Sequence, residues 1–182
     1  SQSEMGGQNR EMQRSMQSMQ FALMLALFLV YVIMASTFES ILHPFVILLS
    51  VPLALVGVGV GLLVTQTAVS VVVLIGAIVL CGVVVNNAIV LVDAVNRFRM
   101  DGMNVFGAVQ KASALRFRPI LITTFTTVLG LFPLSLGLGA GAEMQQPLAI
   151  AVIGGLLSST LLTLGVIPAI YMLFAGTKAS QL

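Results

Sequence analysis

Five apolar segments, each long enough to cross a lipid bilayer, constrain what this chain can fold into. A helix needs about 20 predominantly apolar residues to cross the hydrocarbon core, because each residue adds about 1.5 Å to its length. Apolar residues make up 58% of the chain and charged residues only 8%, whereas soluble domains carry about 25% charge. The sequence therefore predicts an all-α integral membrane protein. The five expected spans are residues 21–37, 45–65, 69–97, 117–136 and 147–174.

Polar segments divide the chain into three parts. Residues 1–20 are expected to form an amphipathic helix that continues into the first span, residues 21–176 the transmembrane domain, and residues 177–182 a tail. Within the transmembrane domain, residues 98–116 form the one sizeable polar connection. Because the chain begins with Ser1 and shows no signal peptide, we expect a piece of a longer protein or a processed subunit.

Basic residues predict the orientation of the spans. They gather around the connection between the third and fourth spans, at Arg97, Arg99, Lys111, Arg116 and Arg118. The positive-inside rule places this connection and the C-terminus in the cytoplasm, and an odd number of spans then places the N-terminus outside.

The third span carries polar side chains at membrane depth. Asn86 and Asp93 are seven residues apart, so they lie on nearly one helix face about two turns from each other, and Asn96 extends that face while Asn87 borders it. Polar groups within a membrane are costly, which favours a functional role, with hydrogen bonding between helices as the structural alternative. Asp93 can hold a proton or an ion, unless it is solvated near the cytoplasmic end or paired with Arg97.

The fourth span places an arginine and a threonine on one face. Arg116 and Thr123 are also seven residues apart, so an arginine near the membrane edge is followed by a hydroxyl two turns deeper. If this face meets the third span, the two helices carry a chain of Asn, Asp, Arg and Thr suited to relaying charge through hydrogen bonds.

Two other patterns have a functional and a structural interpretation each. Met12, Met16 and Met19 have helical spacing, which suits a monovalent copper site but is more often a packing stripe. Glu39 and His43 could form an acid–base or metal pair, but without a third partner an interface role in a turn is favoured.

Small residues and the single cysteine have structural interpretations. Gly57, Gly59 and Gly61 allow close approach of a neighbouring helix. Cys81 lies in an apolar run, so we expect a packing role and no disulfide. The glycine-rich stretch 137–142 lacks the features of a phosphate loop, and no cofactor or metal is expected.

Several segments together resemble a known family. The segment Val84-Val-Asn-Asn-Ala-Ile-Val-Leu-Val-Asp93, followed by Arg116-Phe-Arg-Pro-Ile-Leu-Ile-Thr123, resembles the C-terminal membrane half of the resistance–nodulation–division (RND) permeases, closest to their hydrophobe/amphiphile branch. Phe38-Glu-Ser with His43-Pro44, Val51–Gly57 and Gly137–Gln146 fit the same pattern in the same order. The resemblance implies helices eight to twelve of a twelve-helix permease in the bacterial inner membrane, with a periplasmic N-terminus. It also implies a homotrimer that works with a periplasmic adaptor and often an outer-membrane channel.

The resemblance assigns roles to particular positions. In that family two aspartates on the fourth helix take the proton, a lysine on the tenth helix pairs with them, and an arginine and a threonine on the eleventh assist. Arg116 and Thr123 match the last two, whereas the lysine position holds Asn86, next to a retained Asn87. A lysine is attracted to charged carboxylates and an asparagine can only hydrogen-bond. Either coupling rests on the carboxylates with Arg116 and Thr123, or another ion or substrate is used.

We therefore expect the membrane part of a proton-driven multidrug or amphiphile efflux permease, and not an enzyme. It would supply one wall of a proton-relay site, opposite an N-terminal half that bears intramembrane carboxylates. The relay residues would be Asn86, Asn87, Asp93, Arg116 and Thr123. The alternatives are a non-transporting membrane scaffold or assembly subunit, or an RND-type exporter of lipids or metals, with metals ranked lower because no acidic residue lies deep in the third span before Asp93. A net charge of +2 gives no indication of nucleic-acid binding, and membrane lipid is the expected surrounding.

Overall fold

The computed structural model describes residues 2–38 and 42–179, with Leu42 and residues 174–179 described by their backbone alone. All regular elements in these residues are helices: α1 (Gln2–Phe38), α2 (Leu42–Leu48), α3 (Ser50–Thr65), α4 (Val71–Met100), α5 (Val105–Ser135) and α6 (Ala142–Ala179). Five stretches are long and apolar enough to cross a membrane, because α2 and α3 together form one span, His43–Thr65. The predicted all-helical membrane fold is confirmed at this level.

The second span bends at Leu49, between α2 and α3. Pro52 has no amide hydrogen, so the carbonyl of Leu48 loses the hydrogen bond that a regular helix would give it. The hydroxyl of Ser50 donates to the carbonyl of Ile47 at 2.5 Å, and the amide of Leu49 donates to Phe45 at 3.1 Å. These bonds occupy the carbonyls of Phe45 and Ile47 next to the bend, because polar groups in a membrane need internal partners.

Residues 98–116 were expected to form one polar connection between spans, but most of them are helical. α4 continues to Met100 and α5 begins at Val105, so the connection is residues 101–104 alone. Ala108, Val109 and Ala112 are buried at helical spacing, which makes the start of α5 an amphipathic helix. The side chain of Asn104 caps it by accepting from the amide of Gly107 at 2.8 Å. Polar composition was therefore not a sign of a loop.

Glycines bring α3 and α6 into close contact. A Cβ atom on Gly154 would lie 3.0 Å from the carbonyl oxygen of Gly57 and 3.2 Å from the Cα of Gly61. Gly57 and Gly61 are one helical turn apart, so they present one small face to α6. Gly59 faces the other way and a Cβ there would meet nothing within 4 Å in the described part of the chain.

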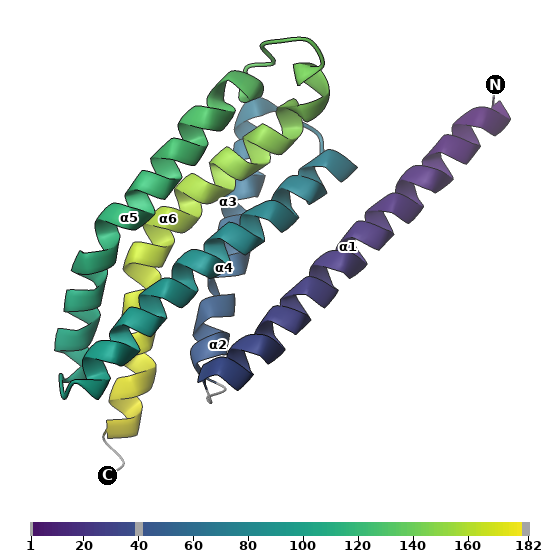
Figure 1. The fold of residues 1–182 in the computed structure, drawn as a ribbon. Helices are drawn as coiled ribbons and strands as arrows, with labels where there is room; N and C mark the ends of the chain where they lie inside the picture. The colour runs from purple at the N-terminus through teal and green to yellow at the C-terminus, as the bar shows by residue number, and fades with distance from the viewer. Residues whose placement is uncertain (1, 39–41, 180–182) are drawn as a thin grey trace.

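Helices α3 to α6 form a bundle, and α1 stands apart from it over most of its length (Figure 1). Met34 is the one fully buried residue of α1 among those described. Leu23, Leu27 and Val30 pack against the core cluster that α2, α4, α5 and α6 share. The N-terminal half of α1 extends away from the bundle, and its Gln2 end lies opposite the end where α4 turns into α5 (Figure 1).

Candidate functional site

The polar residues of α4 lie in different environments. Asn86 is exposed and Asn87 is half-buried, close to the middle of a 30-residue helix. Asp93 lies nearer the connection to α5, where its Oδ2 atom is 3.0 Å from the Nε atom of Arg97. Asp93 is thus paired with Arg97, which was one of the alternatives that the sequence left open. With side-chain exposures of 40% for Asp93 and 75% for Arg97, this is a surface ion pair.

The two predicted residues of α5 differ in how their polar atoms are satisfied. Thr123 is exposed, and its hydroxyl donates to the carbonyl of Pro119, one turn earlier in the same helix, at 3.0 Å. Arg116 is half-buried, and its Nε atom is buried without a hydrogen bond to any described residue. The hydroxyl of Ser113, one turn away on the same face, is in the same state. A buried donor without a partner is costly, so this face needs water or another polar group.

Three of the five predicted relay residues, Asn86, Arg116 and Thr123, lie within about two helical turns of one another along the bundle. α4 and α5 run antiparallel from the short connection at 101–104, so Asn86 of α4 is level with Pro119 of α5. At about 1.5 Å per residue, Arg116 is then about 4.5 Å nearer the connection and Thr123 about 6 Å further from it. No hydrogen bond or ion pair joins any two of the five predicted relay residues within the described chain.

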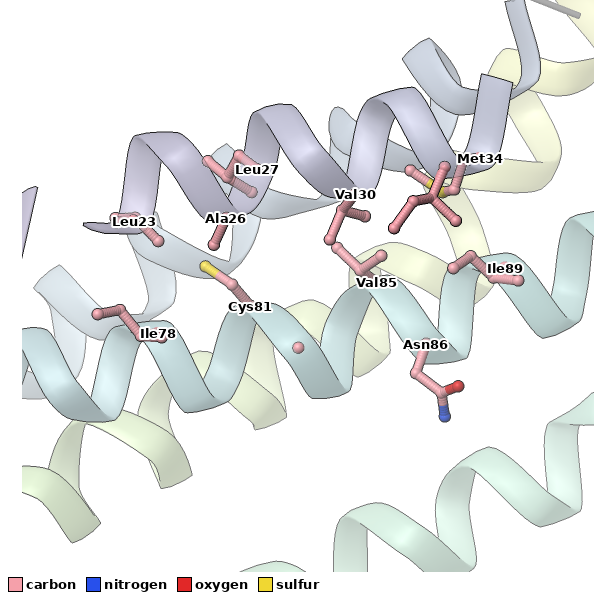
Figure 2. A pocket seen from close by; sticks show the side chains of 12 residues that line it. Leu23, Ala26, Leu27, Val30, Met34, Ile78, Cys81, Val85, Asn86 and Ile89 are labelled. Carbon is pink, nitrogen blue, oxygen red and sulfur yellow. The ribbon is translucent and has the colours of Figure 1, made fainter. Parts of the chain in front are cut away.

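An apolar groove of about 350 Å³ separates α1 from α4. Asn86 is the one amide among the described residues that line it, and Figure 2 shows its side chain pointing away from α1. Cys81 lies on the same wall, buried, as expected of a packing residue. The groove residues are Leu23, Ala26, Leu27, Val30, Ile33, Met34, Ile78, Cys81, Gly82, Val85, Asn86 and Ile89. The amide of Asn86 therefore finds no partner on α1.

The threonine that joins α5 to α6 is Thr124, which the sequence analysis missed. Its hydroxyl is 2.7 Å from the hydroxyl of Thr160, and both residues are buried. One residue along a helix turns the side chain by about 100°, so Thr123 and Thr124 face in different directions. The adjacent pair of threonines was visible in the sequence, but which of them faces α6 depends on the packing of the two helices.

A second polar cluster lies at the C-terminal end of α4, one turn beyond Asp93, and was also missed. The hydroxyl of Tyr171 on α6 donates to the Oδ1 atom of Asn96 at 2.7 Å and accepts from Arg99 at 3.2 Å. The ring of His43 stacks on the ring of Tyr171, with centroids 5.6 Å apart, and Phe38 meets His43 edge to face. Asn96 thus extends the polar face of α4 as predicted, but its partner comes from a segment 75 residues away.

The two remaining motifs are the pair Glu39 and His43 and the methionine stripe on α1. Glu39, expected beside His43, lies outside the described residues. Met12 is exposed and Met16 and Met19 are half-buried, on the part of α1 that stands away from the bundle. No group of three or more His, Cys, Asp or Glu side chains that could hold a metal occurs in the described ranges.

Comparisons with known proteins connect this arrangement to transport. The model of the AcrB/AcrD/AcrF family matches residues 1–175. The chain is 41% identical over 167 residues to the multidrug resistance protein MdtC of Proteus mirabilis (strain HI4320), covering 91% of this chain and 16% of that protein. It is 45% identical over 158 residues to MdtC of Erwinia amylovora, covering 86% of this chain and 15% of that one.

Solved structures show the same fold. A crystal structure of a heavy metal efflux pump superposes with a TM-score of 0.82 at 34% identity, covering 92% of this chain and 16% of the pump. A second crystal form of a heavy metal efflux pump gives a TM-score of 0.78 at the same identity, over 93% of this chain. The chain thus spans about one sixth of the length of the proteins that it matches.

Proposed function

The chain belongs to the AcrB/AcrD/AcrF family of RND permeases, and on that premise we propose that it forms the C-terminal transmembrane half of a proton-driven exporter of drugs or other amphiphiles. In this proposal Asn86, Asn87, Asp93, Arg116 and Thr123 form one wall of the proton-relay site. The two intramembrane carboxylates that take the proton belong to the other half of the permease.

The exposed amide of Asn86, midway along a membrane-spanning helix, carries this proposal. A polar side chain that faces lipid at this depth is costly, so such residues face protein or a water-filled path. The amide points away from α1 (Figure 2), and Arg116 holds a buried donor without a partner in the described chain at nearly the same depth. These two groups together favour a polar partner, either protein or water, that lies against α4 and α5.

Asn86 and Arg116 would respond differently to the charge on a carboxylate. A primary amide donates to a carboxylate and accepts from a carboxylic acid, so Asn86 can stay bonded before and after protonation. The guanidinium of Arg116 attracts the charged form alone. The attraction between Arg116 and the carboxylate would then be lost when the carboxylate binds a proton. The Asp93–Arg97 pair would lie at the cytoplasmic end of the relay.

The remaining features of the proposal follow the family. The chain would lie in the bacterial inner membrane with its N-terminus in the periplasm and its C-terminus in the cytoplasm. The permease would be a homotrimer that works with a periplasmic adaptor and an outer-membrane channel. The exposed apolar side chains around the bundle, such as Phe28, Leu63 and Leu129, would face lipid.

The test is efflux of a fluorescent amphiphile driven by a pH gradient, in vesicles that hold the full-length permease. We expect Arg116→Ala and Thr123→Ala to abolish or strongly reduce efflux while the protein still assembles. The efflux that remains in Asn86→Ala and Asp93→Asn then measures how much each of these two residues contributes to the relay. Thr65→Ala is the matched control, because the hydroxyl of Thr65 also donates to the carbonyl one turn earlier, at 2.8 Å, but on α3. If all four relay variants pump as well as this control, the polar face is packing and the scaffold alternative holds.

Metal export is the second candidate, because both crystal structures that superpose on the chain are of heavy metal efflux pumps. The methionine stripe on α1 would suit a monovalent copper ion. The same vesicles therefore need a second arm, loaded with monovalent copper or zinc in place of the amphiphile. Gradient-driven loss of metal without loss of the amphiphile would replace the first candidate with the second.

A further inference from the structure

Tyr171 connects three helices through two hydrogen bonds and a ring stack. Its side chain is 3% exposed, and its hydroxyl lies between Asn96 and Arg99 of α4, at 2.7 and 3.2 Å. Its ring stacks on His43 of α2 with an angle of 11° between the ring planes. The guanidinium carbon of Arg99 is 5.9 Å from the centre of the same ring, within the range of a cation–π interaction.

The two hydrogen bonds have fixed directions. Arg99 can only donate, so it occupies a lone pair of the Tyr171 oxygen and leaves the single hydroxyl hydrogen for the Oδ1 atom of Asn96. Asn96 and Arg99 are three residues apart and so lie on one face of α4. A rotation of α4 by one residue, about 100°, would carry both side chains away from the hydroxyl.

The orientation of α4 at this point also sets the direction of the relay residues. Asp93 lies one turn from Asn96, and Asn86 lies ten residues along the same uninterrupted helix. A helix transmits rotation along its length because its backbone hydrogen bonds hold successive turns together. A contact that holds α4 at Asn96 therefore holds the faces of Asp93 and Asn86.

We propose that Tyr171 is a positioning residue that holds the rotation of α4 against α6 and so directs Asp93 and Asn86 toward the proton-relay path. This inference rests on the proposed function, which it deepens by adding a residue that acts through others. The bond between Tyr171 and Asn96 is closed in the conformation described here, and proton coupling requires that α4 hold this orientation in part of the transport cycle.

The test compares the two tyrosines of the chain in the full-length permease. Tyr171→Phe removes the hydroxyl and keeps the ring on His43, whereas Tyr31→Phe is the matched control, because the hydroxyl of Tyr31 makes no hydrogen bond in the described residues. We expect Tyr171→Phe to lower the amphiphile exported per proton taken up by about fivefold, the factor that corresponds to the net contribution of the bond to Asn96 alone. Tyr31→Phe should leave that ratio unchanged. Loss of folded protein alone would lower both fluxes together and leave the ratio as in wild type.

Variants of Asn96 provide a rescue test. Asn96→Asp keeps an acceptor for the tyrosine hydroxyl, so we expect it to retain the wild-type ratio, whereas Asn96→Ala should reproduce the Tyr171→Phe loss. Because both variants remove the bond between Tyr171 and Asn96, Tyr171→Phe combined with Asn96→Ala should be no worse than Tyr171→Phe alone. Fully additive effects, or a ratio in Tyr171→Phe equal to that of Tyr31→Phe, would overturn the inference.

A measurement without transport separates this inference from the proposed function. Amide hydrogen exchange in the full-length permease should be faster in residues 93–100 of Tyr171→Phe than of Tyr31→Phe, because the end of α4 is less restrained. If wild-type vesicles show no proton-coupled efflux but exchange still rises, the proposed function fails and the restraint on α4 stands. If efflux is proton-coupled and exchange is the same in both variants, the inference about Tyr171 fails alone.

Discussion

Asn86 holds the position where the resemblance to RND permeases leads us to expect a lysine, and a charge placed there tests the proposed role of this residue. In Asn86→Lys, an ammonium would face the carboxylates that we propose for the other half of the permease and would favour their charged form. Protonation of these carboxylates would then need a more acidic outer solution. We expect the pH at which efflux is half-maximal to fall by about one unit, the lower end of what a nearby opposite charge produces.

The control for this variant is Asn86→Gln, which keeps an amide and adds no charge. We expect its half-maximal pH to equal that of wild type in the same vesicles. A midpoint that stays constant in Asn86→Lys as well would show that Asn86 does not face the groups that take the proton.

Thr124 is predicted to stabilise the fold more than its neighbour Thr123. Thr124→Val removes one partner of the buried 2.7 Å contact with Thr160, and polar contacts between membrane helices contribute about 0.6 kcal/mol on average and up to about 1.7 kcal/mol. Thr123→Val removes an exposed bond within one helix and should cost less than about 0.5 kcal/mol. Denaturant unfolding of the full-length permease in detergent measures both. A larger loss for Thr123→Val would mean that Thr123 has a partner outside this chain.

At the scale of helices, the contact between α3 and α6 predicts which glycines can be replaced. A Cβ atom on Gly57 would collide with the side chain of Ser158 and lie 2.8 Å from the carbonyl oxygen of Gly154. Gly57→Ala should therefore force the helices apart and destabilise the protein by about 1–3 kcal/mol. Gly59→Ala meets open space and should be neutral or stabilising by up to about 1 kcal/mol, because alanine favours a helix over glycine.

Melting temperatures of the two variants in the same detergent would check this difference. The glycines are two residues apart on one helix, so the measurement separates close packing from helix propensity. Equal melting temperatures would contradict the close approach of α3 and α6.

Helices were predictable from the sequence where their cause is local. The five apolar stretches follow from side-chain hydropathy. The helix over residues 105–116 was mistaken for a loop, because its polar outer face concealed the buried stripe at Ala108 and Ala112. The pairing of Asp93 with Arg97 was weighed because the two lie one turn apart.

Contacts between distant segments were not predictable. The hydroxyl of Tyr171 reaches Asn96 across 75 residues and that of Thr124 reaches Thr160 across 36. Both depend on how α6 packs against α4 and α5. A single sequence gives the face of each helix but not the partner that the face meets.

For the whole molecule, the resemblance to RND permeases is confirmed by the family model that matches residues 1–175, whereas the relay itself remains a proposal. The family was accessible from the sequence because several short motifs occur in one order. No hydrogen bond or ion pair joins the proposed relay residues to one another in the described chain, and the partners that we propose for them belong to the other half of the permease. The exposed polar atoms of this chain indicate one side of the proposed site, and a test of its chemistry needs the full-length permease.

The orientation of the whole molecule in the membrane gives the last prediction. Five spans place the Gln2 end of α1 and the connection at residues 101–104 at opposite ends of the molecule (Figure 1). Arg97, Arg99 and Lys111 surround that connection, so the positive-inside rule assigns it to the cytoplasm. In a full-length permease without other reactive cysteines, we expect Gln8→Cys to react with a membrane-impermeant maleimide in intact spheroplasts. Asp101→Cys should react in inverted vesicles instead, because residues 8 and 101 are both exposed and the proposed orientation places them on opposite sides of the bilayer. The reverse pattern would place Asp93 and Arg97 at the periplasmic end and would require protons to travel through the relay in the other direction.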